Sequence, residues 1–167
     1  SGHSKNIRLH YNTNGTVMPD ASLWNYWQEF KWVDIQVSID DYGKRFEYNR
    51  HPAKWADVER NLLEYKVRTQ KDNLQLSIAS TVSLFTIAYL DDFFTHMQKL
   101  GLPTPWLGRL QMPAHYRVGV IPPFLREMIK RKLLTSEHAD VRAAIEWLNE
   151  DDYMHLPIFK KLTAWHD

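Results

Sequence analysis

Alternating apolar and polar residues predict three β-strands in the first half of the chain. The predicted strands cover residues 7–14, 33–40 and 74–82. Each strand has one apolar face and one polar face. On the second strand, for example, Val33 and Ile35 alternate with Asp34 and Gln36. A sheet made of such strands is expected to bury only one of its faces.

Apolar residues at helical spacing predict a helix after each of these strands. The first is capped by Asp20 and runs to about residue 30. The second has Pro52 in its first turn, where proline is well tolerated. The third covers about residues 84–100 and ends at Gly101, a residue type that suits the position after a helix.

The pattern changes after residue 101. Residues 102–123 contain five prolines and only two short strand-like pieces, at residues 106–112 and 116–120. Three further helices are predicted at residues 123–134, 136–149 and 156–165. Ser136 is a suitable N-cap for the second of these helices.

The order of strands and helices is typical of parallel strands joined by right-handed crossovers. Sheets covered by helices on both faces have strands that are apolar on both faces, so helices are expected on one side only. A closed barrel needs about eight strands. We therefore predict an α/β fold with a partial (half) β/α barrel over residues 4–101. An irregular and then helical C-terminal extension over residues 102–167 is expected to pack on it within a single globular unit.

Polar side chains gather where the three predicted strands end. These residues are Asn12, Thr13, Asn14, Ser38, Asp40, Ser80 and Thr81. The carboxyl ends of parallel strands meet at one edge of a sheet, where β/α barrels have their sites. Such compact hydrogen-bonding groups suit a hydroxylated or zwitterionic ligand, and Thr81 is expected to be structural. The same alternation equally fits a sheet whose polar face is covered by water.

Composition narrows the possible chemistry. The 167 residues include 21 basic and 20 acidic side chains, a formal net charge of +1, and no cysteine. This balance gives no reason to expect a nucleic-acid or membrane partner. Without cysteine, the chain itself cannot form disulfides, thiolate zinc sites or cysteine-bound clusters. The eight histidines lack zinc-site spacing, so no metal site is expected, and a cytoplasmic location is expected.

Several stretches resemble the radical S-adenosylmethionine (SAM) enzymes, in particular those with a shortened C-terminal extension called a twitch domain. They are NTNGT from Asn12, VDIQVSIDD from Val33, EYNRHPAKW from Glu47 and STV from Ser80. A later stretch, MPAHYRVGVIPPFLREMIKRKL, is similar to a proline-led segment that precedes a helix in that branch. The resemblance covers about residues 7–134 and rests on the order and spacing of these motifs.

The resemblance implies a partial β/α barrel with a SAM pocket. In the family, a four-iron, four-sulfur cluster on a C-x3-C-x2-C motif reduces SAM and releases a radical that abstracts hydrogen from a substrate. The resemblance implicates Asn12 and Asn14 near the SAM ribose. It implicates Ser38, Asp40 and Arg50 near the ribose and the methionyl carboxylate. An arginine suits a carboxylate because it can bind both oxygens.

The chain departs from the family pattern in two ways. The cluster cysteines and the early strands that would carry them are missing, so the chain resembles the C-terminal half of such a protein. It is expected to be a truncated gene, a fragment, a split subunit or a degenerate descendant, and not to generate a radical alone. The position after Asp40, usually glycine in the family, is Asp41.

Each candidate residue also has a purely structural interpretation. For Asn12 and Asn14 it is turn chemistry, because Asn-Gly is a common turn pair. Ser38 can bond to the local backbone. Asp40 can cap the loop that follows it. Arg50 can form an ion pair with Glu47 or Asp41.

Three functions are consistent with these features. The first is a truncated or split radical SAM-like domain that keeps part of the SAM pocket and acts with a separate N-terminal half-barrel subunit. The second is a non-catalytic module that forms a homo-oligomer, or binds a partner, through its open half-barrel. The third, and least supported, is a complete metabolite-binding or hydrolytic enzyme without a recognisable motif.

Overall fold

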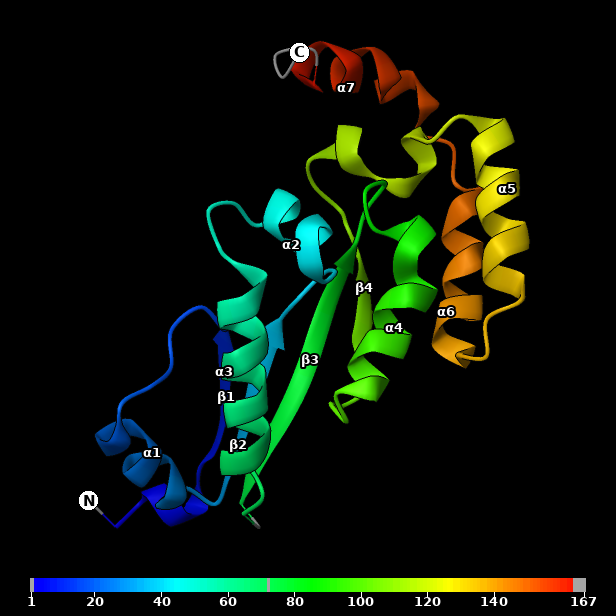
Figure 1. Cartoon of the computed structure of the whole chain (residues 1–167). Helices are drawn as coiled ribbons and strands as arrows, with labels where there is room; N and C mark the ends of the chain where they lie inside the picture. The colour runs from blue at the N-terminus through cyan, green and yellow to red at the C-terminus, as the bar shows by residue number, and fades with distance from the viewer. Residues whose placement is uncertain (1, 72, 164–167) are drawn as a thin grey trace. The chain divides into compact units, whose positions relative to one another are not determined.

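The computed structural model of the protein describes residues 2–71 and 73–163. Its strands form a four-stranded parallel sheet in the order β1-β2-β3-β4 (Figure 1). The strands are β1 (Arg8–Thr13), β2 (Trp32–Ser38), β3 (Leu74–Val82) and β4 (Trp106–Arg109). The predicted α/β fold, a partial β/α barrel with parallel strands, is confirmed.

The chain forms two compact units. The first contains the residues up to Ser80 together with His96–Trp106, and the second contains Thr81–Thr95 and the residues from Leu107 onward. Helix α4 (Leu90–Lys99) contributes its first residues to the second unit and its last residues to the first. The predicted polar ends of the first two strands therefore belong to one and the same unit.

In the first unit, a 3-10 turn precedes β1 and α-helices follow β1 and β2. They are η1 (Ser4–Asn6), α1 (Ala21–Gln28), α2 (Gly43–Asn49) and α3 (Trp55–Arg68). Asp20 caps α1 as predicted, because its Oδ1 accepts the backbone N–H of Leu23 at 2.9 Å. After α4, Gly101 has a positive φ of 62°, as expected for a residue that ends a helix.

The segment after β2 differs from the prediction in two ways. It contains α2, which the pattern of apolar residues does not indicate, because this seven-residue helix buries only Phe46. Pro52 lies in the turn before α3 and not in its first turn, so that prediction is wrong. As a result, Arg50 follows α2 directly as its C-cap.

The sheet of the first unit has one buried face and one polar face, as predicted. Val33, Ile35 and Val37 of β2 are 0% exposed, whereas the residues between them are partly exposed. Trp27 of α1 and Leu62 of α3 are also buried, and α3 crosses one face of the strands in Figure 1. Burial of each such side chain stabilises the fold by about 1.5–3 kcal/mol. Helix packing therefore decides which face of the sheet is left to polar groups.

The loop after β1 requires glycine at position 15. Gly15 has a φ of +72°, and a Cβ atom added to it would lie 2.9 Å from Cγ1 of Val37. The carbonyl of Gly15 accepts a hydrogen bond from Nδ2 of the buried Asn61 at 2.9 Å. The loop is therefore held between β2 and α3, which keeps the end of β1 in place.

Apart from strand residues, the described part of the second unit consists of helices, 3-10 turns and connecting segments. Besides the start of α4, these elements are η2 (Ile87–Tyr89), η3 (Ala114–Tyr116), η4 (Val118–Val120), α5 (Pro123–Leu134), α6 (Ala139–Ala143), η5 (Ala144–Asn149), η6 (Tyr153–His155) and α7 (Leu156–Thr163). The predicted helical C-terminal segment is thus confirmed, and the last two residues of its final predicted helix lie outside the described residues. No helix in this description of the chain is long and apolar enough to cross a membrane.

Two predictions for the second unit are wrong. The strand-like piece at residues 116–120 lies in 3-10 turns, and the single helix predicted at residues 136–149 is α6 followed by η5. Ser136 is not the N-cap, which is His138. Instead, the Ser136 hydroxyl donates to a carboxylate oxygen of Asp91 and accepts the His138 N–H. A tertiary hydrogen bond has therefore replaced the local cap.

Candidate functional site

The candidate site lies where β1 and β2 end. Asn12 of β1 is paired with Gln36 of β2, so the polar residues of the two strands stand side by side. Ser38 is the last residue of β2 and shares the polar face with Gln36, because side chains alternate along a strand. The structure thus brings Asn12 and Ser38, two of the predicted site residues, to the same edge of the sheet.

Asp40 and Arg50 form an ion pair just beyond the end of β2. Nε and Nη2 of Arg50 lie 2.9 Å and 2.8 Å from Oδ2 of Asp40. The structural interpretation of Arg50, a pair with Glu47 or Asp41, is therefore replaced by a pair between two predicted site residues. A guanidinium has five N–H bonds, so this pair leaves donors that a second carboxylate can use.

Glu47 and Asp41 have other partners. Glu47 accepts the Trp55 N–H at 3.2 Å, and this hydrogen bond is the main cause of the lowered pKa of its carboxyl group. Asp41 is 1% exposed; it accepts the Tyr42 N–H at 2.8 Å and pairs with Nε of Arg45 at 2.6 Å. The hydrogen bond to Asp41 also raises the pKa of Arg45. These contacts of Asp41 therefore anchor the loop. In the family that the sequence resembles, this position is usually glycine.

Asn14 takes part in a turn, as its structural interpretation expects. Its Oδ1 accepts hydrogen bonds from the backbone N–H and the hydroxyl of Thr16, at 3.1 Å and 2.7 Å. Asn12, in contrast, is exposed on the polar face of β1. Of the two asparagines, Asn12 is thus the better placed to contact a ligand with its side-chain oxygen.

The end of β3 contributes less than the sequence suggests. Ser80 lies on the buried face of the strand, is 1% exposed, and has an Oγ without a hydrogen-bond partner among the described residues. Thr81 is exposed and belongs to the second unit. Within the first unit, the polar edge is therefore formed by β1 and β2.

Sequence reasoning missed a hydrogen-bonded row on the polar face. Oδ2 of Asp34 lies 2.8 Å from Nδ1 of His10, and Oδ1 of Asp34 accepts the Ser77 hydroxyl at 2.7 Å. The three residues come from three adjacent strands. The contact at Nδ1 leaves Nε2 of His10 as the ring atom available to a ligand. Alternation assigns all three residues to polar positions, but only the strand register shows that they meet.

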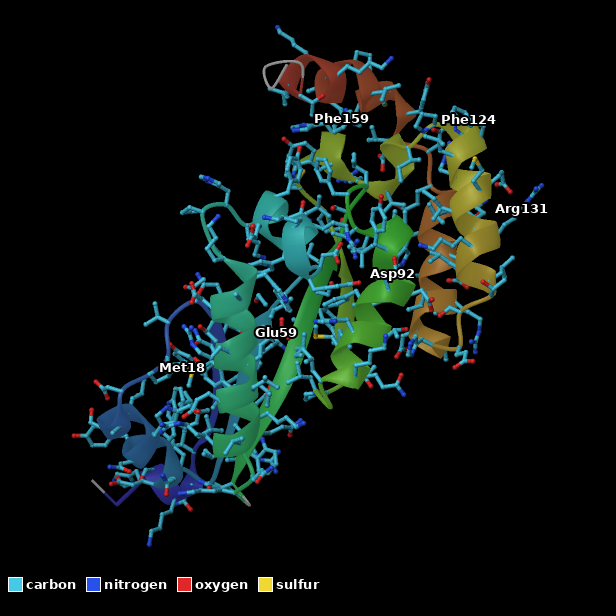
Figure 2. All side chains as sticks on the ribbon, in the orientation of Figure 1. Met18, Glu59, Asp92, Phe124, Arg131 and Phe159 are labelled. Atoms are coloured by element: carbon cyan, nitrogen blue, oxygen red, sulfur yellow. The ribbon has the colours of Figure 1, made fainter. Side chains whose placement is uncertain are left out.

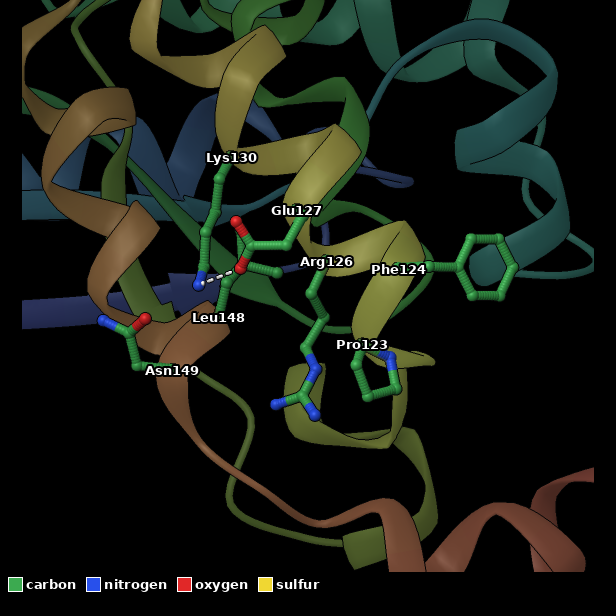
Figure 3. A pocket seen from close by; sticks show the side chains of 7 residues that line it. All are labelled: Pro123, Phe124, Arg126, Glu127, Lys130, Leu148 and Asn149. Atoms are coloured by element: carbon green, nitrogen blue, oxygen red, sulfur yellow. Dashed lines mark hydrogen bonds and ion pairs between the residues drawn. The ribbon is translucent and has the colours of Figure 1, made fainter.

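The second unit has a separate pocket of about 390 Å³ (Figure 3). It is lined by Pro123, Phe124, Arg126, Glu127, Lys130, Leu148 and Asn149. Nζ of Lys130 lies 2.7 Å from Oε1 of Glu127, and this contact lowers the pKa of the Glu127 carboxyl group. Nη1 of Arg126 donates to the carbonyl of Glu150, which ties α5 to the segment after η5. Lys130 and Glu127 thus pair with each other, and Arg126 is held by a backbone carbonyl.

No family model and no curated protein matches the sequence. Similar solved structures include native anSMEcpe with bound AdoMet, which is S-adenosylmethionine (TM-score 0.54, 15% identity, 75% of this chain and 35% of that chain). They also include a hexahistidine-tagged form of anSMEcpe with bound AdoMet (TM-score 0.56, 16% identity, 75% of this chain and 33% of that chain). A third is native anSMEcpe with bound AdoMet and Cp18Cys peptide (TM-score 0.55, 16% identity, 74% of this chain and 35% of that chain).

At this level of identity the likeness concerns the fold alone. That fold is the radical SAM fold, which this chain matches in part. The chain spans about a third of the length of the solved proteins it matches.

The family that the sequence resembles carries two groups, an iron–sulfur cluster and SAM. An iron–sulfur cluster of this kind requires thiolate ligands, and the chain has no cysteine. Residues 2–71 and 73–163 also contain no cluster of three or more His, Cys, Asp or Glu side chains that could hold a metal ion. The acceptor of Asp40 and the donors of Arg50, in contrast, have the chemistry to bind a ligand with hydroxyl groups and a carboxylate.

Proposed function

We propose that this chain is part of a split or truncated radical SAM-like protein, and that the ends of β1 and β2 form part of its SAM pocket. The chain is not catalytic by itself, because it supplies no thiolate ligand for a cluster. A separate segment with the cluster cysteines, such as an N-terminal half-barrel subunit, completes the site.

Each candidate residue has a role that follows from its chemistry. The Asp40 carboxylate accepts hydrogen bonds from ribose hydroxyls, and the Arg50 guanidinium binds the methionyl carboxylate. Their ion pair orients both groups before a ligand arrives. Ser38 and Asn12 supply further hydrogen-bonding groups along the edge. Asn14 contributes less, since its oxygen is bonded within the turn.

One observation carries the proposal: the Asp40–Arg50 pair stands at the C-terminal end of a parallel strand, in a fold whose solved examples include AdoMet-bound structures. Sites of β/α barrels lie at these strand ends. The side chains of Arg50 and Asp40 are only 26% and 16% exposed. Partial burial strengthens their electrostatic interaction with an ionic ligand.

Isothermal titration calorimetry with SAM tests the proposal, on the full chain alone and mixed with a candidate N-terminal half that contains C-x3-C-x2-C. We expect the mixture to bind SAM. Loss of a hydrogen bond to a charged group in Arg50→Gln should weaken binding by roughly tenfold or more. Arg60→Gln is the matched control, because Arg60 is an exposed cation on α3. No binding in either sample, or equal weakening by both variants, contradicts the proposal.

A second candidate function is a non-catalytic module that self-associates through β1. β1 stands at the end of the strand order, and the side chain of Ile7 beside it is 45% exposed. An open strand edge readily pairs with another strand. Light scattering over a range of concentrations tests this function, and a protein that stays monomeric throughout rules it out.

A further inference from the structure

Aromatic rings hold the loop that carries Asp40. Tyr42, the N-cap of α2, stacks on the imidazole of His96 with ring centroids 4.1 Å apart and an interplanar angle of 8°. Trp55, the first residue of α3, lies 5.8 Å from the same imidazole. All of these residues belong to the first unit. The loop after β2 is therefore fastened to the start of α3 and the end of α4.

One ring nitrogen of His96, at which the side chain could bind a proton or a water molecule, is buried. This nitrogen, Nε2, has no hydrogen-bond partner among the described residues. Burial is the main cause that lowers the pKa of His96 from its ordinary value of 6.5, because a charged imidazolium loses its hydration there. The ring is therefore uncharged at neutral pH and stacks as an aromatic group.

The charged groups around His96 act in both directions. Glu59 of α3, which is labelled in Figure 2, and Asp41 of the loop favour the protonated ring, whereas Lys99 of α4 opposes it. Asp41 is already paired with Arg45, whose guanidinium lies 4.9 Å from the centroid of the Tyr42 ring. Burial outweighs the two attractions, so the stack favours a neutral imidazole.

We propose that His96 is a proton-sensitive latch on the loop formed by residues 40–43. The neutral ring holds Tyr42 in the stack and keeps the loop closed. A proton on the ring requires hydration, so the protonated imidazole leaves the stack and releases Tyr42. Opening displaces Asp40 from Arg50. The resulting loss of SAM affinity rests on the proposed function, whereas the latch itself does not.

Hydrogen exchange of backbone amides tests the latch on the full chain without a ligand, at about pH 7.5 and about pH 5.5, the range in which histidine titrates. The reporters are the N–H groups of Tyr42 and Phe46, which bond to Asp41 and to the Tyr42 carbonyl. The amide of Leu62, in the core of α3, is the internal control. Uptake of one proton makes opening up to about tenfold more frequent per pH unit below the ordinary histidine pKa.

Variants separate His96 from other titrating groups. In His96→Phe, which keeps a flat ring without a titrating nitrogen, loop protection is expected to be equal at both pH values. In His51→Phe, the same change at an exposed histidine, the wild-type pH response should persist. In the unmodified protein, the NMR resonance of the Trp55 indole N–H is expected to shift with the same midpoint as the exchange, which gives a readout that does not depend on how a variant folds.

Two results overturn the latch: equal loop protection at both pH values in the wild-type protein, or an unchanged pH response in His96→Phe. If His96→Phe does not fold, an NMR resonance of the Trp55 indole N–H that does not change with pH overturns it as well. Failure of SAM to bind would remove the proposed function and leave these measurements untouched.

Discussion

Each compact unit contains an arginine that is at least partly buried and bonds to an oxygen acceptor, yet the two arginines stand in different surroundings. In the first unit, Arg50 pairs with Asp40 just beyond the end of β2, whose last residue is Ser38. In the second unit, Arg126 is 8% exposed, and it bonds to the carbonyl of Glu150 and fastens α5 to a loop. An arginine that is at least partly buried and bonds to an oxygen acceptor therefore does not by itself mark a site.

The backbone explains the difference. Parallel strands end at a common edge, and alternation leaves their polar side chains together on one face. Charged side chains on helices and loops can reach one another and neutralise each other, as Lys130 and Glu127 do at 2.7 Å. The candidate site thus follows from the placement of its polar groups and not from their number.

The largest expected effect is on the free energy of unfolding, when a buried side chain beneath the polar sheet face is removed. Ile35→Ala removes a 0% exposed side chain from the buried sheet face and should lower the free energy of unfolding by about 2–5 kcal/mol. Met128→Ala, at a 63% exposed position of α5, should change it by less than about 0.5 kcal/mol. Urea denaturation measures both. Equal losses would show that the buried sheet face has no special role.

The next effect concerns the loop that fixes the end of β1. Gly15→Ala and Gly43→Ala each place a side chain at a positive φ, which costs roughly 1–2 kcal/mol. Only Gly15 also faces a contact, since its added Cβ would lie 2.9 Å from Val37, while nothing lies within 4 Å at Gly43. Gly15→Ala should therefore be the more destabilising variant in thermal unfolding, and the reverse order would contradict the packing of this loop.

A third expected effect is a dependence of stability on pH that arises from His96 in the first unit. Because the pKa of His96 is lowered in the folded chain, the unfolded chain binds the proton more tightly. Stability from this group is therefore fully present above the ordinary value of 6.5 and is lost as the pH falls through that value toward the lowered pKa. The loss in wild-type protein should exceed that in His96→Phe when urea midpoints are compared on both sides of pH 6.5. Identical losses would assign the pH dependence to other groups.

The smallest effect is expected in the pocket of the second unit. Lys130→Gln removes one partner of the pair with Glu127, which is an i,i+3 pair on the surface of α5. Such pairs contribute little, so neither the melting temperature nor SAM affinity should change measurably. A clear loss of SAM binding would move the candidate site to the second unit and reverse the comparison.

Local signals predicted much of the first unit. Alternation identified its strands and their buried faces, and Asp20 was correctly placed as the cap of α1. Local signals failed where a tertiary contact replaced a local one. Ser136 bonds to Asp91 and does not cap α6, and α2 is too short to show a helical stripe.

The residue pattern was sufficient to assign polar side chains to one face and to the strand ends, because alternation is a property of the extended backbone. It could not assign their partners. The pair of Arg50 with Asp40 depends on where α2 ends, and the row of His10, Asp34 and Ser77 depends on the register of three strands. Both are set by packing between segments far apart in the chain. Such contacts cannot be read from any local stretch of residues.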